Sequence, residues 1–122
     1  MAVSGCWIRT LPGDLPSGAY FKMTNSSDQA VNLVGVATDA FGMAMLHETE
    51  NKNGMSSMVR VKQVPVPAHG TSNFAPGKYH VMLEKPKKPV KPGMTLPMTF
   101  VFSNSQKVAV ECKVKDPSAI SY

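Results

Sequence analysis

The sequence predicts an all-β fold, either a sandwich or a small barrel, and three observations carry that prediction. Short apolar segments recur along the chain, and turn-forming residues separate them. No window of ten or more residues shows the apolar period of about 3.6 that an amphipathic helix needs. The ten prolines and nine glycines are spread over the 122 residues rather than clustered, which favours many short elements joined by turns.

Four strands are expected in the first half of the chain. Residues 6–11 alternate between apolar and polar positions and end at a Pro-Gly-Asp turn. Residues 19–24 end at the turn-rich run Asn-Ser-Ser-Asp. Residues 30–38 are rich in valine, and residues 41–48 follow after the break at an aspartate.

The second half adds five shorter segments of the same kind. Residues 58–61 and 63–66 are brief, and the proline inside the second one predicts an edge strand or a loop entry. Residues 79–83 form a compact apolar strand. Residues 96–102 and 107–113 are joined by Ser-Asn-Ser-Gln and predict a closing pair of strands.

The whole chain, residues 1–122, is expected to be one β-sandwich domain. A chain of this length buries a sizeable core without metals or many cross-links. Neither an internal repeat nor a linker divides it, and residues 116–122 are expected to be a flexible tail. No apolar stretch approaches the roughly 18 residues that a membrane-spanning helix needs. We therefore expect no membrane span, and we expect a monomer, with a metal-bridged dimer as the alternative.

The formal net charge of +5 indicates a soluble protein with a basic surface. The densest basic run, residues 85–92, holds four lysines and no aromatic residue. Single-stranded nucleic acids are bound where basic groups alternate with exposed aromatic rings. We therefore expect no nucleic-acid partner. The run resembles an extended, solvated loop, with a docking surface for an acidic partner as the alternative.

The two cysteines, Cys6 and Cys112, lie near opposite ends of the chain, and neither belongs to a Cys-x-x-Cys or a Cys/His zinc pattern. A disulfide between the first and last strands would suit an oxidising compartment, and two buried free thiols are the alternative. The sequence around Cys6 faintly resembles a lipoprotein processing site, but no charged and apolar leader precedes it. We expect the sequence to be the mature form of an exported protein.

The candidate functional residues are His47, Met58, His80 and Met82, spaced as His-x10-Met-x21-His-x-Met. Thioethers select soft metals such as Cu(I), and imidazole suits copper among other metals. Because strand side chains alternate, His80 and Met82 share one face, and His47 shares a face with Met43 and Met45. Met58 arrives from a third segment. The pattern predicts a four-coordinate copper site, for Cu(I) first and with some tolerance of Cu(II).

The remaining methionines and His69 have more ordinary explanations. Methionine often fills gaps in a core, and we expect Met43 and Met45 to divide between packing and a weak copper contact. Met55 is the nearest substitute for Met58. Met94 and Met98 lie in the closing segment and are expected to pack. His69 lies in the Pro-Ala-His-Gly turn and is expected to be exposed to solvent.

Nearly the whole chain resembles the PCuAC-type periplasmic copper(I)-binding proteins, the copper chaperone family marked by this His/Met pattern. The segments that carry the resemblance are residues 4–9, 18–21, 24–25, 33–36, 46–49, 76–83 and 88–93. A small residue is more usual in the family where Cys6 stands. Carried over by position, the family's copper ligands fall on His47, Met58, His80 and Met82, all of which are present.

The resemblance implies a cupredoxin-like Greek-key β-sandwich or barrel that works in the periplasm. It also implies a chaperone that carries Cu(I) to a copper-accepting protein, such as the CuA-bearing subunit of cytochrome c oxidase or another copper carrier. The donor set supports carriage, because neutral thioethers can be exchanged one at a time with an incoming ligand. Protonation of the two imidazoles competes with metal, so copper should loosen below about pH 6.

Two other functions compete with this interpretation. A blue-copper redox site needs a cysteine thiolate beside two histidines, and no His or Met closely follows Cys112. A β-sandwich binding module, or a copper-storage or resistance protein, is the main alternative because this kind of fold hosts many functions. An enzyme is not expected, since no nucleophile with a base and no carboxylate pair is present. Glu48 is expected either to support its neighbour His47 or to lie on the surface.

Overall fold

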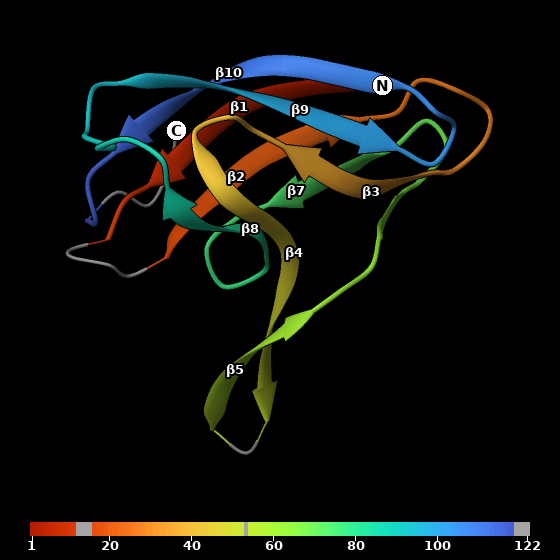
Figure 1. The fold of residues 1–122 in the computed structure, drawn as a ribbon. Coiled ribbons are helices and arrows are strands. Elements are labelled where there is room, and N and C mark those ends of the chain that lie inside the picture. Colours follow the sequence, from red (N-terminus) through yellow and green to blue (C-terminus); the bar gives the residue numbers. More distant parts are fainter. Residues whose placement is uncertain (12–15, 53, 119–122) are drawn as a thin grey trace.

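The structure, a computed structural model, describes residues 1–11, 16–52 and 54–118. Within these residues it holds ten strands and no helix, so the predicted all-β class is confirmed (Figure 1). The strands are β1 (Ala2–Arg9), β2 (Ser17–Thr24), β3 (Val31–Ala37), β4 (Phe41–Lys52), β5 (Met55–Arg60), β6 (Val64–Val66), β7 (Thr71–Phe74), β8 (Tyr79–Pro86), β9 (Thr95–Phe102) and β10 (Lys107–Lys115). A helix able to cross a membrane is therefore not found in the described ranges.

The strands form one mixed sheet in the order β5-β4-β8-β2-β1-β10-β9-β3-β6. β1 and β10 pair in parallel, and the other strand pairs in the described residues are antiparallel. The sheet divides along one edge of β2. The first residues of β2, 17–19, pair with β8, and its last residues, 21–24, pair with β7. This division lets the sheet fold over itself and enclose a core (Figure 1).

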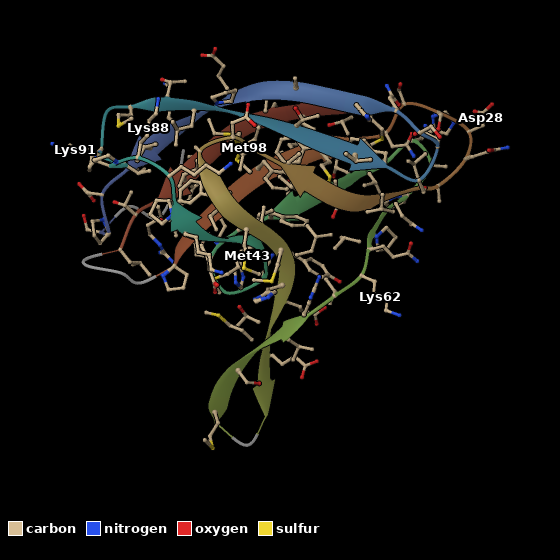
Figure 2. All side chains as sticks on the ribbon, viewed as in Figure 1. Asp28, Met43, Lys62, Lys88, Lys91 and Met98 are labelled. Carbon is tan, nitrogen blue, oxygen red and sulfur yellow. A yellow bond between two sulfur atoms is a disulfide. The ribbon has the colours of Figure 1, made fainter. Side chains whose placement is uncertain are left out.

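The core consists of the inward-facing residues of nearly every strand. Phe21 of β2 stacks on Phe74 at a centroid distance of 4.4 Å and packs against Phe100 at 4.5 Å. Met98 is buried among them, as predicted for a packing methionine (Figure 2). Burial of each such side chain contributes about 1.5–3 kcal/mol, which makes this core the main source of stability.

Cys6 and Cys112 form a disulfide between β1 and β10. Of the two alternatives for the cysteines, the structure shows the cross-link. The bond joins residues 106 positions apart, so it removes much conformational freedom from the unfolded chain. It also removes the thiolate that a blue-copper site requires, and it leaves the Cys6 sulfur without a free valence for a lipid anchor.

The structure departs from the predicted strand bounds mainly at the β4–β5 hairpin. β4 continues to Lys52 and β5 begins at Met55, beyond the predicted ends at residues 48 and 58. Figure 1 shows this hairpin projecting away from the rest of the sheet. Met55 and Met58 of its outer part are exposed rather than packed on a core, so this sequence lacks the apolar alternation that predicts a strand.

Three other segments can be compared with the sequence prediction. β7 was not predicted, because Thr71–Phe74 is mostly polar and only its last residue is buried. β6, with its central proline, lies at one end of the sheet, as expected of an edge strand. The predicted tail begins with a turn in which the Asp116 carboxylate accepts hydrogen bonds from Ser118, and residues 119–122 lie outside the described part of the chain.

Candidate metal centre

The register between β4 and β8 brings the two candidate histidines together. His47 lies directly opposite His80, and Met45 lies directly opposite Met82. Opposed residues on antiparallel strands point to the same face, so these four side chains share the outer face of the sheet. The residues between them, Leu46 and Val81, point into the core. The alternation inferred from the sequence is therefore present, and its apolar half anchors the two strands that carry the histidines.

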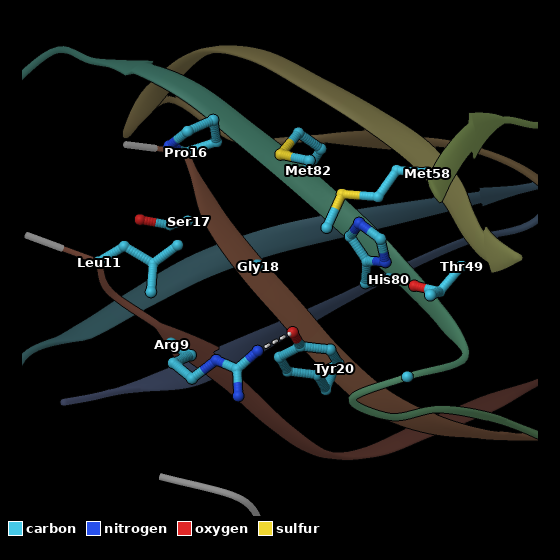
Figure 3. Close-up of a pocket in the computed structure, with 11 residues that line it drawn as sticks. Arg9, Leu11, Pro16, Ser17, Gly18, Tyr20, Thr49, Met58, His80 and Met82 are labelled. Atoms are coloured by element: carbon cyan, nitrogen blue, oxygen red, sulfur yellow. Dashed lines mark hydrogen bonds between the residues drawn. The ribbon is translucent and has the colours of Figure 1, made fainter. Parts of the chain in front are cut away.

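Met58 reaches the same outer face from the projecting hairpin. It lies opposite Thr49, which is two residues along β4 from His47. Its side chain is 61% exposed, whereas His80 is only 5% exposed. In Figure 3 the Met58 thioether extends from β5 toward the His80 ring. The four predicted ligands thus come from three adjacent strands.

A hollow of about 280 Å³ opens on this face (Figure 3). Three of the four candidate ligands line it, and His47 lies just outside, with its ring edge-on to His80 at a centroid distance of 5.6 Å. The lining residues are Arg9, Leu11, Pro16, Ser17, Gly18, Tyr20, Thr49, Met58, Gly77, His80 and Met82.

One nitrogen of each histidine ring is buried and has no hydrogen-bond partner in the described residues: Nδ1 of His47 and Nε2 of His80. The other His80 nitrogen is engaged, since the ring hydrogen-bonds the Lys78 backbone. Such a backbone bond fixes the orientation and the tautomer of a metal-binding histidine. A buried polar atom without a partner is costly, and a metal ion in this position would satisfy both nitrogens.

Electrostatics keep both rings neutral at physiological pH. Burial is the main cause that lowers the pKa of His80, and the charges of His47 and Arg9 lower it further, against a raising effect of the Lys78 backbone bond. Burial also lowers the pKa of His47, together with the charge of Arg60, while Glu84 acts in the opposite direction. Neutral imidazole is the form that binds metal.

Tyr20 and Arg9 form the floor of the hollow, and the ligand spacing did not predict them. The Arg9 guanidinium donates a hydrogen bond to the Tyr20 hydroxyl at 3.0 Å and lies over its ring. The Tyr20 ring lies 6.5 Å from His80. Gly18 makes room for this tyrosine, because a Cβ at that position would lie 2.9 Å from the hydroxyl. Arg9, Tyr20 and His80 lie on three different strands, so their proximity can be predicted only when the register between those strands is known.

Several other sequence expectations are settled by position. Met55 is 75% exposed near the hairpin tip, and its odd spacing from Met58 places it on the opposite face of β5, so it is a poor substitute ligand. Glu48 pairs with Tyr79 on the face opposite His47, and therefore does not support that ring. His69 is exposed as predicted, and its ring nitrogen lies 2.7 Å from the Asp28 carboxylate.

Met43 and Met45 do not pack in the core, which was one of the two roles expected for them. Met43 is 37% exposed, and Met45 is half-buried on the outer face. Met94 is likewise exposed, and its sulfur accepts a hydrogen bond from the Lys91 amide at 3.2 Å. Exposed thioethers thus occur both beside the candidate site and away from it.

The donor set fits a soft metal. No three His, Cys, Asp or Glu side chains gather closely enough to hold an ion anywhere in the described ranges. The available donors are two imidazole nitrogens and two thioethers, a combination that suits Cu(I) far better than magnesium or calcium.

Comparisons with known proteins agree with this chemistry. A family model described as "Putative lipoprotein LpqE-like" matches residues 1–114. A protein of Leifsonia xyli subsp. xyli, described as "Putative lipoprotein Lxx21020", is 32% identical over 115 residues, covering 93% of this chain and 69% of the relative. An uncharacterized protein of Rickettsia prowazekii is 33% identical over 100 residues, covering 80% of this chain and 55% of the relative. The chain thus spans only part of each of these relatives.

Solved structures share the fold, among them two copper-loaded forms. The copper-bound PCuAC domain from PmoF2 matches with a TM-score of 0.78 at 26% identity, covering 94% of this chain and 92% of that domain. The Cu(I) form of DR1885 from Deinococcus radiodurans matches with a TM-score of 0.74 at 34% identity, covering 91% of this chain and 75% of that protein. The resemblance to PCuAC-type proteins and the cupredoxin-like β fold are therefore confirmed.

Proposed function

This chain belongs to the LpqE-like family, and from that premise we propose that it binds one Cu(I) ion and carries it to a copper-dependent acceptor protein. The proposed ligands are His47, Met58, His80 and Met82. The solved relatives that share the fold include copper-bound and Cu(I)-bound forms, which supports a copper-binding, chaperone-like role.

One observation carries the proposal: two buried imidazole nitrogens that have no hydrogen-bond partner among the described residues lie on the same face as two thioethers. His47 and His80 are register partners, and Met82 follows His80 on that face. Such a set supplies four neutral donors, two of them soft, without a carboxylate or a thiolate. A neutral donor set favours the singly charged Cu(I) ion, while the imidazoles lend some affinity for Cu(II).

The burial of the ligands suggests how the ion is released. His80 is buried and held by the Lys78 backbone, whereas Met58 is mostly exposed on the hairpin. An incoming thiol or thioether can therefore replace Met58 first, while the histidines keep the ion in place. Met82 follows, and the imidazoles are the last ligands to dissociate. Copper passes to the acceptor without being free in solution.

We propose as acceptor the CuA centre of cytochrome c oxidase or another copper carrier, which is what the resemblance to PCuAC-type proteins implies. We assign the protein to the periplasm, because relatives are described as lipoproteins and the disulfide suits an oxidising compartment. We propose a single domain and a monomer, with no enzymatic activity. A copper-storage protein would share the site but would not transfer its ion.

A competition titration with a colorimetric Cu(I) chelator tests the site. We expect one equivalent of Cu(I) to bind, and we expect the variant Met58→Ala/Met82→Ala to lose Cu(I) affinity far more than Cu(II) affinity, because it loses the soft donors. Met94→Leu serves as the control, since that methionine is exposed but distant in the sequence from the ligands. An equal loss of both ions would contradict the soft-ligand assignment. The absence of any one-equivalent binding would favour a binding module without copper.

Transfer is tested separately by mixing the Cu(I)-loaded protein with a soluble, copper-free CuA domain. Appearance of the purple CuA absorption after addition of the second copper equivalent in an oxidising buffer would support delivery. The His80→Ala variant, which loses the buried ligand, should load poorly and transfer little. Tight binding without transfer would point instead to storage.

A further inference from the structure

The outer face of β4 and β8 carries two methionines that the proposed site does not use. Met43 and Met45 stand on β4, and Met45 is the register partner of the proposed ligand Met82. We propose that Met43 and Met45, with Met82 shared between the two positions, form a second and weaker site for a soft monovalent cation. This inference rests on the proposed function, because Cu(I) is then the physiological ion at both positions.

The register places the three thioethers within reach of one ion. Directly opposed residues such as Met45 and Met82 have Cβ atoms about 4.5–5.5 Å apart, and diagonal neighbours such as Met43 and Met82 are about 7–8 Å apart. Methionine has three flexible torsions beyond the backbone. Three sulfurs that start from these positions can converge on one ion without a change in the backbone.

Burial shows that packing does not account for these side chains. Met43 is 37% exposed on β4, where Figure 2 labels it, and Met45 is half-buried outside the core cluster. By contrast, Met23 and Met98 are fully buried and fill the interior. The two methionines of β4 therefore lie outside the core cluster, on the same face as the first site.

The charged residues around Met43 and Met45 explain why the second site should bind its cation more weakly than the first. Glu84 is the register partner of Met43 on the same face, and its charge extends as far as His47. Its carboxylate favours a cation there. Arg60 and Lys62 line a hollow of about 550 Å³ together with Met45, and their charges oppose a cation. With no buried imidazole available, the second position holds its ion less tightly than the first.

Because Met82 is shared, an ion can move between the second site and the first. An ion held by Met43 and Met45 can gain Met82 and then the imidazoles, so that each step forms one bond as another breaks. The same steps in reverse lead from the histidines toward the open edge of the sheet. The second site is therefore an entry or exit position for the first.

The test uses the nine methionine methyl groups of the wild-type protein as reporters, labelled with carbon-13 and followed by NMR during titration with Ag(I), a redox-inert soft monovalent ion. We expect the first equivalent to shift Met58 and Met82. Further equivalents should shift Met43 and Met45, and move Met82 a second time. The exposed Met55 and Met94 are internal controls, and their signals should stay in place.

Each outcome separates the two proposals. If Met58 and Met82 respond but Met43 and Met45 remain unshifted in excess Ag(I), the second site does not exist and the proposed function stands. If Met43 and Met45 shift no more than Met55 and Met94, binding there is nonspecific and the second site is again rejected. If the first equivalent leaves Met58 and Met82 unshifted, the proposed function itself fails.

A variant gives an independent check with Cu(I). Met43→Leu/Met45→Leu conserves side-chain volume and removes both sulfurs. We expect it to abolish the second, weaker binding phase, while the matched variant Met55→Leu retains that phase. Persistence of the second phase in Met43→Leu/Met45→Leu would overturn the proposal. Circular dichroism confirms that each variant is folded.

Discussion

The β1–β10 pair and the β4–β5 hairpin differ in how firmly each is attached to the core. The first is cross-linked by the Cys6–Cys112 disulfide and buries Ile8 and Val114 in the core. The second projects from the sheet and exposes Met55 and Met58 (Figure 1). One region fixes the scaffold, and the other carries an exposed thioether above the histidines. We therefore expect stability and the proposed ligand exchange to depend on different strands.

This division has a physical basis in local stability. Segments with few buried apolar contacts open more readily than core strands, and binding elements that move are drawn from such segments. The proposed ligands follow the same gradient, from the buried His80 to the exposed Met58. If the comparison is correct, changes to the scaffold should alter unfolding, and changes to the hairpin should alter copper binding alone.

The largest effect should come from removing the disulfide. We expect Cys6→Ala/Cys112→Ala to lower the free energy of unfolding by about 2–5 kcal/mol, because the unfolded chain regains the freedom of a long closed loop. Urea denaturation measures this change. The Cu(I) affinity of the folded variant should stay close to that of the wild type. A large loss of affinity in the folded variant would show that the cross-link also shapes the site.

The next effect concerns the two kinds of ligand. We expect Met58→Ala to weaken Cu(I) binding by on the order of tenfold, about 1.4 kcal/mol, and His80→Ala to weaken it more. The reason is that His80 is buried and oriented by the Lys78 backbone, whereas water or solute can reach Met58. Chelator competition at constant pH measures both affinities. Equal losses would mean that exposure does not set a ligand's contribution.

A smaller effect should appear as a pH dependence of the metal-free protein. Burial lowers the pKa values of His47 and His80, so the folded protein binds fewer protons than the unfolded chain in mild acid. The stability that the neutral rings contribute is fully present above pH 6.5, the value for an unperturbed histidine, and is lost as pH falls toward the lowered pKa values.

Thermal unfolding between pH 7.5 and pH 5 checks this sign. The variant His47→Gln/His80→Gln lacks both rings, and its unfolding should show a weaker pH dependence over the same interval. A wild-type protein that became more stable as the pH fell from 7.5 to 5 would contradict the assignment. Cu(I) binding should weaken over the same interval, because protons compete for the same nitrogens.

The smallest effect should be that of a hairpin change on stability. We expect Met58→Leu to alter the free energy of unfolding by less than about 0.5 kcal/mol, since most of the side chain is exposed. The same variant should bind Cu(I) more weakly. A clear loss of stability would mean that Met58 helps to hold the hairpin, and the contrast between the two regions would then be less sharp.

The sequence predicted the parts of the fold in which one face is buried. Strands such as β8 alternate clearly, because Val81 and Leu83 enter the core while His80 and Met82 do not. The outer hairpin and β7 were missed, since a strand without a buried face carries no alternation. Register is likewise absent from the pattern of a single strand. The register decides that Met45 faces Met82 and that Tyr20 lies close to His80.

The tilted aromatic rings beside the proposed site give the protein an optical property. Trp7 is the chain's single tryptophan, and it lies 4.7 Å from Tyr20, which in turn lies 6.5 Å from His80. Both Trp7 and Tyr20 are almost fully buried, so solvent contributes little to the emission. A metal ion at the proposed ligand His80 would be separated from the fluorophore by one aromatic ring, so we expect copper binding to change the intrinsic fluorescence of the unlabelled protein.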